Sequence, residues 1–349
     1  MPCHDERFRE IAGQRPTLQS FVSAFCDELG NQIWPTIGLA REDAPRTISN
    51  TVVFGGFRDA VCVSAVVAGQ SLTLKWGGPP RGILHSDAFD IYPWFLSPAL
   101  EGYITVVTPA LRGVEEVGRL RAQSTPALGN RSLSLIHVDR PLLQALIKRW
   151  EHCFVGGRES VEDRRLFRAL EMACAASRTP GGVDASEHDA GRAVALWVSA
   201  FEILAHDGEW SGPRIVVSLL DRVQWLRQEL KARDRVVFFD KKKKTPIPTN
   251  VAGEVYEHLY RVRNDFLHGN PVTAETLKLA KPKQSVLFFA APLFRLALTA
   301  VLDLRSPELS DASDDQNYDH IAAGTPFSGP QLLAEDAILM ADEASTMAG

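Results

Sequence analysis

The sequence predicts an α+β protein, with a mixed α+β N-terminal domain of unassigned role over residues 1–138 and an all-α helical bundle over residues 139–305. Short β-branched runs bounded by glycine and proline dominate the first part and are typical of strands. From Pro141 onward, apolar residues recur at helical spacing instead. The remaining segment, residues 306–349, carries nine acidic residues and no Lys or Arg, which predicts an acidic tail that is disordered in its first half. Within it, apolar residues among the acids of 331–344 indicate either an isolated amphipathic helix or a further part of the solvated tail.

In the N-terminal part, apolar spacing predicts a helix over residues 18–29, and β-branched runs predict strands over 48–54, 60–67 and 71–76. Further strands are expected over 103–107 and 133–138, with a short helix near 114–120. The pairs Gly55-Gly56 and Gly77-Gly78 are interpreted as turn glycines, because no phosphate-loop pattern surrounds them.

The second part contains a series of helices. Pro141 and Pro213 stand at positions typical of a helix start. Pro292 should bend the last helix. The expected helices cover residues 141–150, 161–177, 190–206, 213 to about 232, a helix ending at 268, 274–280 and 285–304.

The overall composition is that of a folded protein, with 45% hydrophobic and 23% charged residues. The net charge of -5 hides an uneven distribution, because the nine acids of the tail leave 38 basic against 34 acidic residues elsewhere. The five cysteines lie far apart without a Cys-x-x-Cys pair, which favours reduced thiols in a cytoplasmic protein. The polar N-terminus predicts no signal peptide, the most apolar run (286–294) is too short to span a membrane, and the histidines show no metal-ligand spacing.

The end of the helix before Gly269 brings together residues suited to phosphate chemistry. Arg263 offers a planar cation, Asn264 an amide, and His268 a group that exchanges protons near neutral pH. Residues five apart on a helix are rotated by roughly 140°, so one chain does not easily direct Arg263 and His268 at one phosphate. An irregular helix end, or a second copy across a two-fold axis, would be needed. The structural alternative is that Arg263 pairs with an acid such as Asp265 or Glu257.

The segment around these residues resembles a known family. Tyr256-x-x-Leu259-Tyr260-x-x-Arg263-Asn264-Asp265-Phe266-Leu267-His268-Gly269 is similar to the signature of the HEPN superfamily, and of its ApeA-like branch in particular. The runs 166–170 and 195–204 also resemble helices of that branch. The resemblance covers residues from about 141 to 304 and leaves the N-terminal domain aside.

The resemblance implies a helical-bundle homodimer whose paired motifs form a metal-independent endoribonuclease without a cofactor, often a toxin or an antiphage-defence effector. Arg263 would then stabilise charge on the phosphate, Asn264 would be the polar residue after it, and His268 would be the acid/base. Glu202 matches a recurring acid of the family, with a supporting role or simply a salt bridge as alternatives. Asn270 stands where some relatives carry a modifiable Tyr. Alternatives of another class are a non-catalytic dimerising interaction module and an RNA-binding regulator.

Other residues are candidate RNA contacts. The basic run comprises Lys241, Lys242, Lys243 and Lys244, and either binds RNA or is a solvated loop. Trp76, Tyr92 and Trp94 could stack on bases, although such residues are more often buried. The acidic tail could also lie over a basic groove and compete with RNA, or simply aid solubility. The expected partner is RNA, and an inhibitor or sensor protein would fit a toxic activity.

Overall fold

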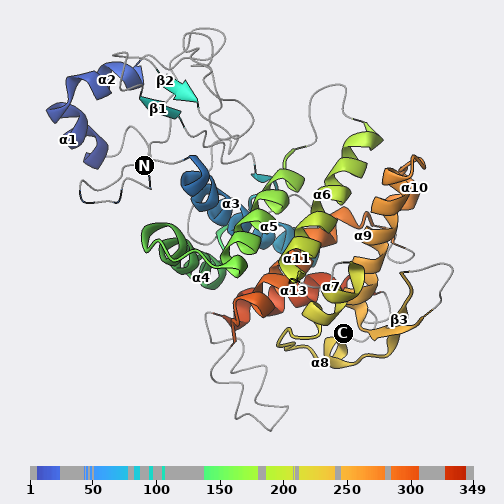
Figure 1. The fold of residues 1–349 in the computed structure, drawn as a ribbon. Coiled ribbons are helices and arrows are strands. Elements are labelled where there is room, and N and C mark those ends of the chain that lie inside the picture. The colour runs from blue at the N-terminus through green and yellow to red at the C-terminus, as the bar shows by residue number, and fades with distance from the viewer. Residues whose placement is uncertain are drawn as a thin grey trace.

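The computed structural model describes residues 6–23, 51–77, 82–86, 94–96, 104–106, 137–179, 186–206, 212–239, 245–279, 284–305 and 327–342, together with residues 43, 45, 48 and 208. The described chain is mostly helical (Figure 1). Its strands form two short antiparallel pairs, β1–β2 and β3–β4. The elements are α1 (Glu6–Gln14), α2 (Pro16–Ser23), α3 (Thr51–Trp76), β1 (Trp94–Leu96), β2 (Ile104–Val106), α4 (Arg140–Trp150), η5 (Glu151–Val155), α5 (Val161–Ala176), α6 (Glu187–Ala205), α7 (Pro213–Leu220), α8 (Gln228–Lys231), β3 (Arg235–Val237), β4 (Ile247–Thr249), α9 (Val251–Leu267), α10 (Ala274–Leu277), α11 (Leu287–Val301) and α13 (Ser328–Leu339).

The strands predicted over residues 48–54, 60–67 and 71–76 are wrong, because Thr51–Trp76 is one helix, α3. It packs against α4, α5, α11 and α13, so burial on several sides outweighs the strand preference of its valines. Its buried hydroxyls remain satisfied, since Ser64 and Ser71 donate to the carbonyls of Ala60 and Val67 one turn back. α3 is long and apolar enough to cross a membrane by length and composition, although 61% of that stretch is buried in the protein.

The glycine pairs predicted as turns have different roles. Gly55 and Gly56 lie inside α3, where a Cβ at Gly56 would meet the ring of Phe167 at 3.2 Å. Gly77 follows the helix with φ +60°, a conformation that favours glycine, as expected for a turn. Neither residue of the first pair is therefore in a turn, and close packing explains only Gly56, because a Cβ at Gly55 would have nothing within 4 Å.

The helices predicted in the second part form, with one break. α4, α5, α6, α9, α10 and α11 match their expected segments within a few residues, and α11 contains Pro292. The single helix expected from residue 213 to about 232 is instead divided into α7 and α8. The intervening segment turns inward, burying Trp225 and Leu226, and the backbone N–H groups of Leu226 and Arg227 donate to Glu335.

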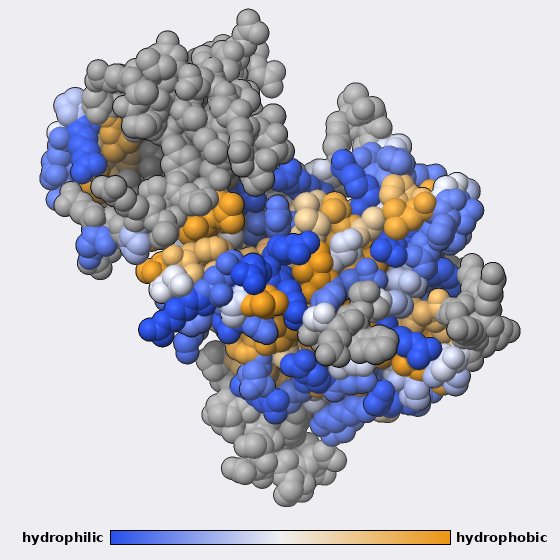
Figure 2. Space-filling view, viewed as in Figure 1, coloured by the Kyte–Doolittle hydropathy of each residue, from blue (hydrophilic) through white to orange (hydrophobic). Residues whose placement is uncertain are grey.

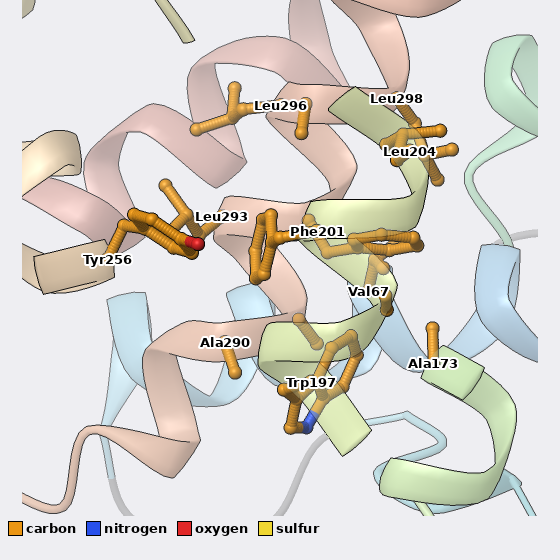
Figure 3. Packing of buried hydrophobic residues seen from close by; sticks show 14 of the residues in the cluster. Val67, Ala173, Trp197, Phe201, Leu204, Tyr256, Ala290, Leu293, Leu296 and Leu298 are labelled. Atoms are coloured by element: carbon orange, nitrogen blue, oxygen red, sulfur yellow. The ribbon is translucent and has the colours of Figure 1, made fainter. Parts of the chain in front are cut away.

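One hydrophobic core joins these helices across the boundary expected at residue 138. It includes residues of α3 as well as α5, α6, α9 and α11. Figure 3 shows Val67, Phe201, Tyr256 and Leu293, from four of these helices, converging in it. On the face seen in Figure 2, separate apolar patches lie among hydrophilic residues.

The end of the predicted tail also belongs to this core: the helix allowed for residues 331–344 forms as α13, but it is packed in the core and not isolated or solvated. α13 packs against α3 and α11, and its Ala337 and Ile338 are fully buried. Its acids are held from several elements: Glu335 by the backbone after α7, and Asp336 by Lys75 and Arg227. The burial of its apolar residues explains why this helix packs in the core despite its acidic residues.

A buried polar cluster joins α13 to α11 and α4. Arg295 of α11 is 1% exposed, donates from Nε to Asp139 at 2.8 Å, and bonds through Nη1 to Gln331 of α13. Asp139 also caps the start of α4 by accepting from Leu142 N. Arg295 thus connects Asp139, at the start of α4, to Gln331 of α13.

Several predicted features lie outside the described residues: the lysine run 241–244, Tyr92, the helix near 114–120, most of the strand over 133–138, and the first part of the tail. The strand predicted over 103–107 is confirmed as β2, paired with β1. Trp76 is 61% exposed and therefore not a core residue, and Lys75 Nζ lies 5.7 Å from its ring centroid.

Candidate functional site

Helix α9 carries the three residues predicted to be catalytic. Asn250 caps its start, with the side-chain oxygen accepting from the N–H groups of Ala252 and Gly253. A stripe that includes Val255, Leu259 and Val262 is buried, as its helical spacing predicts. His268 is the C-cap and Gly269 follows at φ +78°, which confirms the predicted left-handed end of the helix.

Helix α6 runs antiparallel beside α9. Phe201 and Tyr256 are in edge contact, with ring centroids 5.5 Å apart. Gly191, near the start of α6, faces Phe266, near the end of α9, and a Cβ there would lie 2.3 Å from the phenyl ring. The glycine therefore permits the close approach that brings Glu202 of α6 within reach of α9.

Arg263 is held at this α6–α9 contact. Its Nη2 lies 3.6 Å from Glu202 Oε2, its Nη1 donates to Asn264 Oδ1 at 3.0 Å, and its guanidinium lies 5.7 Å from the centroid of the Tyr260 ring. Burial raises the pKa of Glu202, and Arg263 partly opposes this shift. Glu202 is thus the ion-pair partner of Arg263.

The two partners suggested from sequence for Arg263 are engaged elsewhere. Glu257 forms an ion pair with Arg261 at 3.8 Å, and Asp265 accepts from the side chain of Asn270 at 3.2 Å. The prediction that Arg263 pairs with an acid is therefore confirmed, but the acid is Glu202 of α6 and neither of the two nearby residues.

His268 stands apart from Arg263. Its backbone N–H donates to Asn264 O at 3.0 Å, and His268 is exposed to solvent. Within the described part of the chain, its side chain makes no hydrogen bond or ion pair. The side chain of Arg263 leans over Tyr260, toward the start of α9, because helical side chains tilt toward the N-terminus. A single chain in this conformation does not bring Arg263 and His268 onto one phosphate.

The opposite face of α9 borders an open cavity of about 450 Å³, between α9, β3 and the end of α13. Arg261 and His258 line it, along with Phe238, which is 45% exposed. Sequence reasoning missed these residues. One signal was available, because Arg261 precedes His268 by seven residues, close to two helical turns.

Over the described ranges, no group of three or more His, Cys, Asp or Glu residues is arranged to hold a metal ion. The cysteines Cys62, Cys153 and Cys174 are buried and form no disulfide within the described part of the chain. Arg263, Asn264 and His268 at the end of α9 remain the residues predicted for the site.

Comparison of the chain with protein-family models, with curated proteins and with solved structures finds no match.

Proposed function

We propose that this protein is a metal-independent endoribonuclease of the HEPN type. The observation that supports it best is the exposed, unengaged imidazole of His268 at the end of the helix that also carries the bonded pair Arg263–Asn264. A solvent-facing imidazole can act as a general acid or base toward a bound substrate. A toxin or antiphage-defence effector, acting on RNA and restrained by an inhibitor or sensor protein, is the proposed biological role.

The proposed reaction uses the 2′-hydroxyl of the RNA as nucleophile. His268 accepts the hydroxyl proton while the 2′-oxygen attacks the adjacent phosphorus. The P–O5′ bond breaks, and the leaving oxygen takes a proton from a general acid or from solvent water. Arg263 stabilises the negative charge on the pentacovalent phosphorus. The products are a 2′,3′-cyclic phosphate and a 5′-hydroxyl.

A homodimer is part of this proposal. Because Arg263 is directed toward α6 and His268 lies beyond the end of α9, we infer that a two-fold pair of chains brings together the Arg263 of one copy and the His268 of the other. Leu267, beside His268, is 57% exposed and offers an apolar side chain for such an interface.

A second candidate function is a non-catalytic interaction module. The contacts of Arg263 with Glu202, Asn264 and Tyr260 support it, because an arginine with these contacts can have a purely structural role and join α6 to α9. An RNA-binding regulator would share the fold and bind RNA without cutting it.

Cleavage of RNA in the presence of EDTA tests the proposal. The wild type is expected to produce 2′,3′-cyclic phosphate ends, and His268→Ala and Arg263→Ala to cut at least about 100-fold more slowly. Arg263→Lys, which keeps the charge without the planar fork, should also be impaired. Arg214→Ala, an exposed arginine of α7, is the matched control and should cut normally.

Mixing the two inactive variants tests the dimer. A site that takes Arg263 from one copy and His268 from the other is restored in mixed dimers, so part of the activity should return after co-refolding. Mixtures as inactive as the separate variants would place both residues of a site on one chain. If the wild-type protein forms a folded dimer and leaves RNA intact, the interaction module is favoured. If it binds RNA in a salt-sensitive way without cutting it, the RNA-binding regulator is favoured.

A further inference from the structure

The cavity beside α9 shares a face of the helix with His268. Seven residues separate Arg261 from His268, which leaves them about 20° apart around the axis, whereas Arg263 is about 140° away from His268. Asn264 lies between Arg263 and His268 around the axis, about 40° from His268. The arginine on the histidine's side of α9 is therefore Arg261, and Arg263 belongs to the side that contacts α6.

Arg261 is fixed in place by a buried histidine. His258 Nε2 lies 3.0 Å from Thr276 O, and because a carbonyl only accepts, Nε2 carries the proton of the neutral ring. Nδ1 is then left to accept from Arg261 Nη2 at 2.8 Å. Burial, with the nearby charge of Arg261, lowers the pKa of His258 and keeps the ring in this neutral form.

The guanidinium of Arg261 keeps donors for a further ligand. Its side chain is 47% exposed, and Glu257 Oε2 lies 3.8 Å from Nη1, longer than a hydrogen bond. The other carboxylates of the cavity are engaged, because Glu254 and Asp342 both pair with Arg235. Their charge is thus partly neutralised on the side of the cavity away from Arg261.

The rest of the cavity is suited to a flat apolar group. Val237, Val251 and Val255 line it as buried residues. Val236 of β3 and Phe238, the residue directly after β3, are 47% and 45% exposed, and β3 contacts α9 (Figure 1). An exposed aromatic ring beside a half-exposed arginine is the pair of features that single-stranded nucleic acid uses, one for a base and one for a phosphate.

We propose that this cavity is a nucleotide subsite for single-stranded RNA, with a phosphate on Arg261 and the neighbouring base against Phe238. The inference rests on the proposed ribonuclease function and adds a substrate-binding face to it. Arg261 and His268 lie about 10 Å apart along the helix axis, so one phosphate does not reach both. Arg261 therefore binds a phosphate flanking the one that is cleaved, and the cavity selects the base next to it.

Two variants with matched controls test the subsite. Arg261→Gln and Phe238→Ala remove the phosphate and base contacts. Arg214→Gln on α7 and Phe288→Ala, an aromatic residue of α11 that is 55% exposed, leave the cavity intact. The readouts are KM and kcat for RNA cleavage, and binding of a 2′-O-methyl oligonucleotide, which lacks the attacking hydroxyl, at several salt concentrations.

Both subsite variants should raise KM about tenfold or more with a smaller change in kcat, since each contact is outside the reacting phosphate. Arg261→Gln should also reduce the slope of log affinity against log salt by about 0.7, the value for one phosphate contact on a single strand. Phe238→Ala should leave that slope unchanged and weaken any base preference. The two controls should behave as wild type.

The outcomes separate this inference from the proposed function. Cleavage by the wild type with subsite variants indistinguishable from the controls overturns the subsite and leaves the ribonuclease standing. No cleavage, but oligonucleotide binding that Arg261→Gln weakens with the expected slope change, supports the subsite and overturns the ribonuclease. No cleavage and no binding overturns both.

Discussion

Tyr256 is fully buried where α6 meets α9, yet its hydroxyl has no hydrogen-bond partner among the residues that the structure describes. Burial, reinforced by the nearby Glu202, raises the pKa of this phenol, so the hydroxyl stays neutral. A buried hydroxyl without a partner costs stability, while the ring itself packs on Phe201. The aromatic ring is therefore the part of Tyr256 that stabilises the contact.

Tyr256→Phe should accordingly raise the free energy of unfolding, by about 1 kcal/mol, because it removes the unpaired hydroxyl and keeps the ring. Urea denaturation measures the change. Tyr260→Phe, at a half-buried position one turn later, is the control and should stay within about 0.5 kcal/mol of wild type. A loss of stability in Tyr256→Phe would mean that the hydroxyl has a bound partner after all.

At this scale, local patterns predicted the residues of the site but not their partners. Helical spacing placed Arg263, Asn264 and His268 correctly at the end of α9, and Gly269 at its C-cap. The acid that pairs with Arg263 is Glu202 on α6. The family resemblance had singled out Glu202, with a salt bridge as one alternative, but no local pattern near Arg263 identified the two residues as partners. Arg261 was missed for the same reason, since β3 and Thr276 complete its surroundings from other parts of the chain.

Among the elements, α3 depends most on small residues. Gln70 donates from Nε2 to Leu84 O at 3.0 Å, and Ser86 bonds to α5 through Cys174 O at 2.6 Å, so segment 82–86 runs between the two helices. Gly69 allows this, because a Cβ at that position would lie 2.1 Å from the carbonyl oxygen of Ile83.

Gly69→Ala should therefore lower the free energy of unfolding by about 1–3 kcal/mol, since backbone on both sides must move apart. Gly55→Ala, in the same helix but with nothing within 4 Å of the new Cβ, should instead raise it by up to about 1 kcal/mol, because alanine favours helix. Thermal or urea unfolding of both variants checks the opposite signs. Equal effects would show that segment 82–86 is not packed as described.

The same helix shows why the fold class was only partly predictable. Runs of valine divided by glycine are typical of strands, and α3 contains both. Its helical state depends on being surrounded by α4, α5, α11 and α13, which no local window contains. Helices with one apolar stripe and clear caps, such as α5 and α6 with their capping boxes at Ser160 and Ser186, were predictable within a few residues.

In the molecule as a whole, Glu335 is a buried carboxyl that joins α13 to the segment before α8. Burial raises its pKa from 4.5 to about 7, and the N–H groups of Leu226 and Arg227 oppose this shift by donating to it. It is fully buried in α13 and also accepts from Gln331. A deletion of residues 306–349 could be used to ask whether the acidic tail competes with RNA. The same deletion would remove α13 from the core.

Because its pKa is raised on folding, Glu335 binds a proton more tightly in the folded than in the unfolded protein. Its contribution to stability is present below about pH 4.5 and is lost as the pH rises to about 7, by roughly 3 kcal/mol in total. Glu335→Gln, which cannot ionise, should lack this loss, so its stability relative to wild type should increase over that interval.

Urea midpoints measured from pH 4 to pH 8 give this comparison, and Glu229→Gln, exposed on α8, is the matched control. A constant difference between Glu335→Gln and wild type across the interval would contradict the prediction. The direction of the change in this stability difference is the decisive result. No other contact described for α13 would make Glu335→Gln more stable relative to wild type as the pH rises.

The place of α13 has a consequence for synthesis. A nascent chain emerges from the ribosome in order, and domains normally begin to fold as they appear. Here α3 emerges early, but one of the helices that covers it, α13, begins only at Ser328. Until then, apolar residues of α3 and α11 have no permanent cover, so chains interrupted before α13 should need chaperones and be degraded. If the proposed activity is toxic, only translation through α13 would release it.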